Sequence, residues 1–127
     1  MACQSETTPE PDASVPVDAP TTPAPEVVLS VGTVTGVRGE GYLGFTGIPY
    51  AQAPVDALRW AAPVAHPGWS TPLAADAPPS ACPQDALGLV AGGAGDCLYV
   101  NVHTPDPMPS DAPLIVWLHG GGFVFGE

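Results

Sequence analysis

The chain has 127 residues, enough for at most one small domain. It carries 13 acidic residues against two arginines and no lysine, so its formal net charge is -11. So few cations argue against binding to nucleic acid and against docking on an anionic membrane surface. No apolar run approaches a membrane-spanning length, and we expect no transmembrane segment.

Residues 1–26 are predicted to form a disordered tail or linker. The segment is acidic and rich in Pro, Thr and Ala, with six prolines among its 26 residues. Such a composition cannot bury enough apolar surface to offset the entropy of the chain. We therefore expect two parts, this tail at 1–26 and a domain at 27–127.

The start of the tail contains a candidate lipidation site. Ala2-Cys3 followed by polar residues is typical of a mature bacterial lipoprotein, in which the cysteine carries lipid and a flexible stalk follows. No signal peptide is visible, so its leader would have been trimmed or missed. The alternative is an incidental cysteine in a disordered tail.

The amino-acid composition changes after the tail. Residues 27–31 and 33–37 are β-branched and punctuated by glycine, which predicts strands of a small antiparallel sheet. Residues 41–47 continue the pattern. Residues 47–51 are expected to turn out of the sheet, because Pro49 cannot donate to a central ladder.

Residues 39–44, GEGYLG, match the dinucleotide pattern G-x-G-x-x-G. That motif needs a helix that opens at its third glycine, so that the helix N-terminus can hold the pyrophosphate. The residues that follow, FTGIP, will not start a helix. A hairpin with a glycine-permitted turn is the better interpretation.

Residues 52–96 have no sustained helical period and predict a long irregular connection, pinned by Trp60 and Trp69. Cys82 and Cys97 bracket a Gly/Ala-rich stretch. A disulfide here would close a loop of about 15 residues and contribute ~3 kcal/mol in the chain-entropy model. It would also place the protein in an oxidising compartment. Two buried free thiols are the alternative.

The last third of the chain predicts two strands. Residues 98–102 alternate in polarity, and residues 104–113 contain four prolines and read as a turn. Residues 114–118 are apolar throughout, which is typical of a strand buried on both faces. Such a strand needs covering layers of helices, and the sequence predicts almost none. We therefore expect the chain to be the front part of something larger.

Three glycines follow this apolar run, in His119-Gly120-Gly121-Gly122. No Lys-Ser/Thr follows, so the motif is not a phosphate-binding P-loop. Backbone N–H groups of a bare loop can point into a cavity and stabilise an oxyanion, and the HGGG-type motif of lipases and esterases is such a device. The alternative is a glycine-rich turn.

Four segments precede the glycine loop in a distinctive order and spacing. They are Gly47-Ile48-Pro49-Tyr50-Ala51 with Pro54 and Arg59-Trp60, Cys82-Pro83-Gln84, Asp96-Cys97-Leu98-Tyr99-Val100-Asn101-Val102, and Thr104-Pro105. Together with the loop they resemble the N-terminal part of type-B carboxylesterases, the family that includes the cholinesterases. The resemblance covers about residues 32–126.

The resemblance implies a fold of the α/β class, the α/β-hydrolase fold with an extra N-terminal β-meander. These residues would supply only the meander and the first core strands up to the oxyanion loop. Cys82 and Cys97 would form the family's first disulfide. The disulfide and a lipidated Cys3 would place the protein outside the cell or in the cell envelope.

The resemblance also assigns roles within the glycine loop. Gly121 and Gly122 would match the two glycines that donate N–H bonds to the oxyanion. His119 and Gly120 would support the loop, with the histidine orienting it rather than acting as a base. Phe123 would line the pocket or pack beneath the loop.

The implied reaction is hydrolysis of a small-molecule carboxylic ester by acyl transfer to serine, with no metal and no cofactor. The nucleophile on its G-x-S-x-G elbow, the acid and the histidine would all follow the loop. None of the six serines present has those flanking glycines, so we expect the 127 residues to be inactive alone. The alternatives are a non-catalytic binding or adhesion module and a real short β module stapled by a disulfide.

Two positions depart from the family pattern. Gly95 stands where an acid is usual, and His103 stands where an apolar or aromatic residue is common. Glycine in place of the acid at residue 95 removes a salt-bridge partner for an arginine. Arg59 could instead pair with Asp96, a contact worth at most ~1 kcal/mol at a surface.

Overall fold

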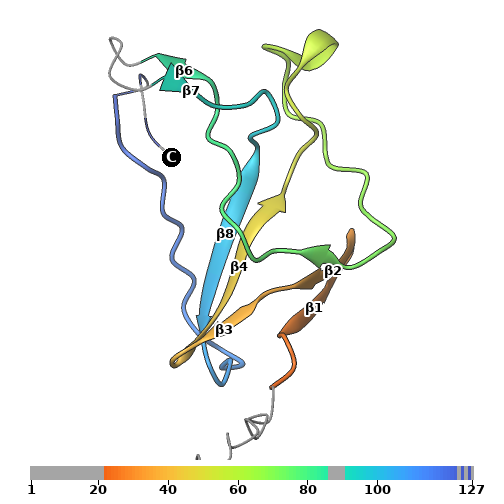
Figure 1. The fold of residues 1–127 in the computed structure, drawn as a ribbon, viewed down its shortest axis with the longest axis vertical. Coiled ribbons are helices and arrows are strands. Elements are labelled where there is room, and N and C mark those ends of the chain that lie inside the picture. Colours follow the sequence, from red (N-terminus) through yellow and green to blue (C-terminus); the bar gives the residue numbers. More distant parts are fainter. Residues whose placement is uncertain (1–21, 86–90, 123, 125, 127) are drawn as a thin grey trace, which may run out of the picture.

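The computed structural model describes residues 22–85, 91–122, 124 and 126. These residues form eight short strands in three small sheets, together with one three-residue 3₁₀ helix, η1 (Asp56–Leu58) (Figure 1). The strands are β1 (Glu26–Leu29), β2 (Gly32–Thr35), β3 (Val37–Gly39), β4 (Tyr42–Pro49), β5 (Leu73–Ala74), β6 (Gln84–Asp85), β7 (Ala91–Gly92) and β8 (Tyr99–Pro105). No helix in this part of the chain is long and apolar enough to cross a membrane.

The first sheet has the order β1-β2-β5. β1 and β2 form an antiparallel hairpin, and β5 pairs with β2 in parallel. Trp69 closes this sheet, because its Nε1–H donates to Thr33 O at 2.6 Å and its backbone N–H donates to Val31 O at 2.9 Å. Pinning of the connection by Trp69 is therefore confirmed. The same expectation for Trp60 is wrong, since that side chain is 93% exposed.

The second sheet has the order β3-β4-β8, antiparallel throughout. β3 and β4 are joined by a tight turn in which Gly41 has φ +77°, a conformation that favours glycine. The hairpin predicted for residues 39–44 is confirmed. β4 runs on to Pro49, so the expected exit at residue 47 is wrong; proline is tolerated at the strand end, where the Tyr50 N–H continues the pairing by donating to Leu98 O at 3.1 Å.

A β-bulge in β4 sets which side chains face the core. Phe45 pairs with Val102 and Ile48 pairs with Val100, so two residues of β4 oppose only Asn101 on β8. The Asn101 Oδ1 atom accepts from the Gly47 N–H at 2.9 Å and satisfies the donor that the bulge leaves unpaired. The extra residue keeps Phe45 and Ile48 on one face, and both are buried.

The core lies between the two three-stranded sheets. It consists of Val34 from β2, the β4 residues Leu43, Phe45 and Ile48, and Ala75, with Val27, Trp69 and Leu73 packed against it. The segment that contains β5 links the sheets, because the Ala75 N–H donates to Thr35 O at 2.7 Å while Thr46 N–H donates to Ala75 O at 2.8 Å. The small size of Ala75 permits this close approach.

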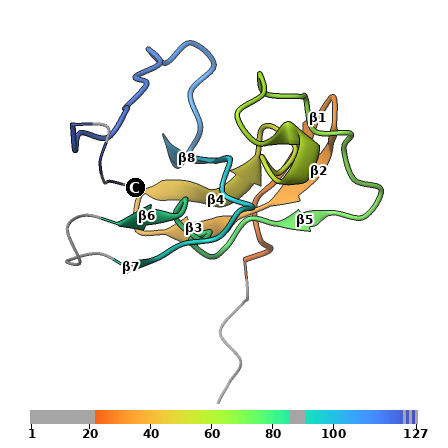
Figure 2. The same ribbon diagram turned by 90° about the horizontal axis from the view of Figure 1, so that it is seen from above.

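The predicted strand at 114–118 is wrong for this structure. The segment runs separately from the sheets in Figures 1 and 2, without strand pairing in the described residues. Its five side chains are 73–87% exposed. The physical reason is that a strand needs hydrogen-bonding neighbours, and none of the described strands lies against it. β8 also extends to Pro105, so the proline-rich turn begins at residue 106 rather than 104.

Candidate functional site

The glycine loop follows the unpaired apolar segment. Gly121 has φ +122° and Gly122 has φ +62°, both in the region that favours glycine. A side chain in such a conformation costs roughly 1–2 kcal/mol. Two successive positive φ values thus explain locally why residue types other than glycine fit this loop poorly.

The space beside the loop is open. A Cβ atom built on Gly120 or on Gly122 would meet nothing within 4 Å. Among the described residues, none accepts a hydrogen bond from the N–H of Gly121 or Gly122. The loop is therefore uncrowded on the side that a Cβ would occupy at Gly120 and Gly122.

His119 lies against the backbone of the loop. Its Nδ1 atom is 2.8 Å from Gly120 O. Because a carbonyl oxygen can only accept, Nδ1 carries the proton and donates this bond. That geometry suits a histidine that orients the loop, and the roles assigned to His119, Gly120, Gly121 and Gly122 remain predictions.

The far end of the loop folds back on its beginning. The Val124 N–H donates to Gly121 O at 3.1 Å and forms a turn. Gly126 has φ +137°, and a Cβ atom built there would lie 2.6 Å from Gly120 O and 2.8 Å from His119 Cε1. The two ends of the loop are thus in contact, and a side chain at residue 126 would separate them.

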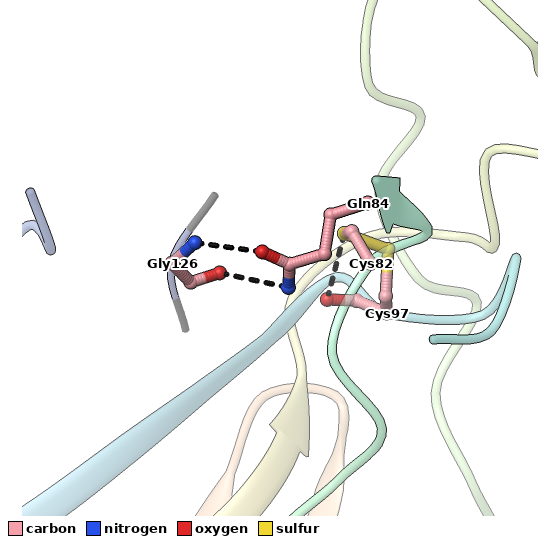
Figure 3. Close-up of a disulfide and its surroundings, with 4 residues drawn as sticks. All are labelled: Cys82, Gln84, Cys97 and Gly126. Atoms are coloured by element: carbon pink, nitrogen blue, oxygen red, sulfur yellow. Dashed lines mark hydrogen bonds between the residues drawn. A yellow bond between two sulfur atoms is a disulfide. The ribbon is translucent and has the colours of Figure 1, made fainter. Parts of the chain in front are cut away.

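The predicted disulfide between Cys82 and Cys97 is confirmed, and the alternative of two free thiols is wrong. The two Cα atoms are 4.9 Å apart. The Gln84 side chain leaves the strand next to this bridge and reaches Gly126 (Figure 3). The sequence motif that contains Gln84 indicates the family and gives no sign of this contact, which joins residues 42 positions apart.

The two departures from the family pattern have local consequences. At Gly95 an added Cβ would come within 2.6 Å of Val55 Cγ1, so packing against Val55 explains why a glycine fits there. His103 lies on β8 opposite Gly44, with its ring centroid 6.2 Å from that of Tyr42. It is exposed on the edge strand.

The ion pair considered between Arg59 and Asp96 does not form. The Arg59 guanidinium lies over the Trp60 ring, 5.2 Å from its centroid, which is a cation–π contact. Within the described ranges the ion pair that forms joins Arg38 to Asp106. It ties the β3–β4 hairpin to the end of β8.

Asp96 contacts Tyr99 instead. The pKa of Tyr99 is raised above its ordinary value of 10.0, first by burial and then by the hydrogen bond and negative charge of Asp96. Asp96 directly precedes Cys97 in the chain, and Tyr99 is the first residue of β8. It therefore links the disulfide region to the second sheet.

Three predictions fall on residues outside those described. Cys3 and most of the expected tail lie in the first 21 residues, and Phe123 is a single position in the glycine loop. The lipidation of Cys3 and the role of Phe123 stay predictions.

A sequence profile described as "Carboxylesterase family" matches residues 23–127, which is most of the chain. The chain belongs to the carboxylesterase family. Para-nitrobenzyl esterase of Bacillus subtilis is 41% identical over 106 residues, which cover 79% of this chain and 22% of that enzyme. Acetylcholinesterase of Bungarus fasciatus is 36% identical over 118 residues, covering 77% of this chain and 20% of that enzyme.

Solved esterase structures are similar over the same share of the chain. A para-nitrobenzyl esterase structure matches with a TM-score of 0.72 at 40% identity, covering 80% of this chain and 21% of the esterase. A carboxylesterase of Geobacillus stearothermophilus matches with a TM-score of 0.71 at 31% identity, with 80% and 20% covered. The family resemblance predicted from the motifs is confirmed. The chain spans about a fifth of the length of the curated relatives it matches.

Proposed function

We propose that the protein to which these residues belong is a carboxylic ester hydrolase that works by acyl transfer to a serine. The observation that carries the proposal is the bare loop of a carboxylesterase-family chain, with Gly121 and Gly122 at positive φ and open space beside Gly122. The N–H groups of these two glycines would stabilise the oxyanion of the tetrahedral intermediate. Loss of one such donor typically costs about 2.7–4 kcal/mol of transition-state stabilisation.

In this proposal residues 27–127 supply the N-terminal β-meander and the first core strands of an α/β-hydrolase fold. The three small sheets and the disulfide would correspond to the meander. The apolar segment 114–118 would become a core strand when neighbouring strands pair with it. Its exposure in the present structure supports this assignment, because so apolar a segment is stable only when covered.

The nucleophilic serine, its histidine and the acid would lie beyond the loop. The third oxyanion donor would be the N–H that follows the serine. The 127 residues contain no G-x-S-x-G, so we propose that they do not hydrolyse esters alone.

The test is to read the locus onward from Glu127 and to express the complete open frame beside the 127-residue chain. We expect a G-x-S-x-G in frame, hydrolysis of an aryl ester such as p-nitrophenyl acetate by the complete product, and labelling of its serine by a fluorophosphonate. The 127-residue chain should show neither. A folded, oxidised complete product without turnover or labelling would support the non-catalytic binding module instead.

We also propose that the protein is secreted or held in the cell envelope. The Cys82–Cys97 disulfide supports an oxidising compartment. Lipidation of Cys3 would anchor the protein there through the tail. Feeding cells an alkyne fatty acid should label the full product and fail to label Cys3→Ser; equal labelling of both would remove the anchor from the proposal.

A further inference from the structure

Gln84 makes a two-point contact with the end of the glycine loop. Its Nε2–H donates to Gly126 O at 3.2 Å, and its Oε1 atom accepts from the Gly126 N–H at 2.8 Å (Figure 3). The two residues are 42 positions apart in the chain. One amide side chain thus supplies Gly126 with both bonds that a neighbouring strand would otherwise provide. The reciprocal donor and acceptor also fix which way the amide points.

The backbone of Gln84 is held firmly at its base. It pairs with Gly92 in the β6–β7 hairpin, within the loop closed by the Cys82–Cys97 disulfide. Nearby, the Ala94 N–H donates to Ala81 O at 2.8 Å. The disulfide and these backbone pairings restrict the positions that the Gln84 backbone can adopt.

Gly126 transmits this contact to the predicted oxyanion donors. It lies against Gly120 O and the His119 ring, which begin the loop whose tip is Gly121 and Gly122. Because the start and end of the loop lie close together, a shift of Gly126 would alter the packing of Gly120 and His119. The side chain of Gln84 bonds to both backbone polar groups of Gly126, the N–H and the carbonyl oxygen.

We infer that Gln84 is a positioning residue that holds the glycine loop against the disulfide-closed hairpin and so sets the direction of the Gly121 and Gly122 N–H groups. The inference rests on the proposed esterase function for its catalytic consequence. Gln84 touches neither substrate nor reacting atoms. It acts through Gly126, and its loss should leave substrate binding largely intact while weakening stabilisation of the oxyanion.

The test uses the complete gene product with Gln84→Glu and Gln84→Ala. Glutamate has the size of glutamine, but its carboxylate cannot donate to Gly126 O and would repel it. We expect kcat to fall about 10- to 100-fold in both variants, with KM little changed, because small misplacements of catalytic groups cost rates of this order. Affinity for a trifluoromethyl ketone, whose hemiketal oxygen imitates the oxyanion, should fall in parallel with kcat/KM.

A pH profile separates positioning from simple structural damage. The carboxyl introduced by Gln84→Glu can donate once it is protonated, so its rate relative to wild type should rise as the pH falls toward the ordinary glutamate pKa of about 4.3. The rate of Gln84→Ala relative to wild type should not rise. Gln52→Glu is the matched control, since Gln52 also donates through Nε2 to a backbone oxygen, that of Ala65 at 3.4 Å, and lies outside the loop contact. It should keep wild-type kcat.

Hydrogen exchange provides a readout that needs no activity. The amides of Val124 and Gly126, which donate hydrogen bonds in this structure, should exchange faster in Gln84→Glu than in wild type, while those of β4 should not change. Wild-type kcat in folded Gln84→Glu, or unchanged exchange in the loop, would overturn the inference. An inactive wild-type product would refute the proposed function alone, and loop exchange would then decide the role of Gln84.

Discussion

At the scale of single residues, glycine relieves backbone strain at most of the positive φ values in the described residues, although Asp56 and Trp60 also adopt them. Gly41 at a hairpin turn and Gly122 at the tip of the glycine loop have φ +77° and +62°, and neither has any atom near the place of a Cβ. They share backbone conformation and open surroundings and differ in location. This makes them a matched pair for separating strain from function.

Gly122→Ala should reduce kcat of the complete product by about 100-fold or more, because strain displaces a proposed oxyanion donor. Both substitutions should lower the free energy of unfolding by roughly 1–2 kcal/mol, because alanine is strained at positive φ. Gly41→Ala should leave kcat unchanged. Ester hydrolysis together with chemical denaturation of both variants makes the comparison. Equal kcat values for the two variants would contradict the proposed role of Gly122.

Tyr99 should give the protein a dependence on alkaline pH. Its raised pKa means that the folded state holds the hydroxyl proton more tightly than the unfolded state, whose pKa is about 10. This contribution to stability is present below that pH and is lost as the pH rises through the folded pKa. Unfolding free energies measured across this range should fall less steeply in Tyr99→Phe. Identical slopes would mean that burial and Asp96 do not shift this group.

At the scale of elements, side chains from the connecting segments stabilise strands that are too short to be stable alone. β1 and β2 have four residues each, and a two-stranded hairpin is at best marginal in water. Trp69 stabilises this hairpin by packing on the core and donating to Thr33 O. The disulfide does the same for β6 and β7, which have two residues each.

Trp69→Phe should destabilise the fold by about 1–3 kcal/mol, because Thr33 O loses its partner and part of the ring contact is lost. Trp60→Phe is the control, and its side chain is 93% exposed. Urea denaturation followed by circular dichroism should show a lower midpoint for Trp69→Phe only. A matching loss in Trp60→Phe would show that the two tryptophans are equivalent.

At the scale of the whole molecule, segment 114–118 exposes five consecutive apolar side chains to solvent. Its side chains, from Leu114 at 87% exposed to Val116 at 73%, form an uninterrupted run of exposed apolar residues. Exposed runs of this kind associate with one another or with the chain that normally covers them.

A polypeptide of these 127 residues should therefore self-associate and bind a hydrophobic dye. A version that ends at Ser110 should stay monomeric, because the core residues of both sheets precede that point. Light scattering over a range of concentrations makes the measurement. A monomeric 127-residue chain would show that the segment is shielded in solution.

Local chemistry in the sequence determined the hairpin at residues 39–44, the presence of short strands after residue 26 and the membership of the carboxylesterase family, because glycine turns, β-branched runs and motif spacing act over a few residues. The sequence also indicated the Cys82–Cys97 pairing through the family resemblance. Tertiary structure alone decided the bulge that keeps Ile48 in the core, the exposure of residues 114–118 and the contact from Gln84 to Gly126. These features depend on which distant segments meet, and no local pattern specifies that meeting.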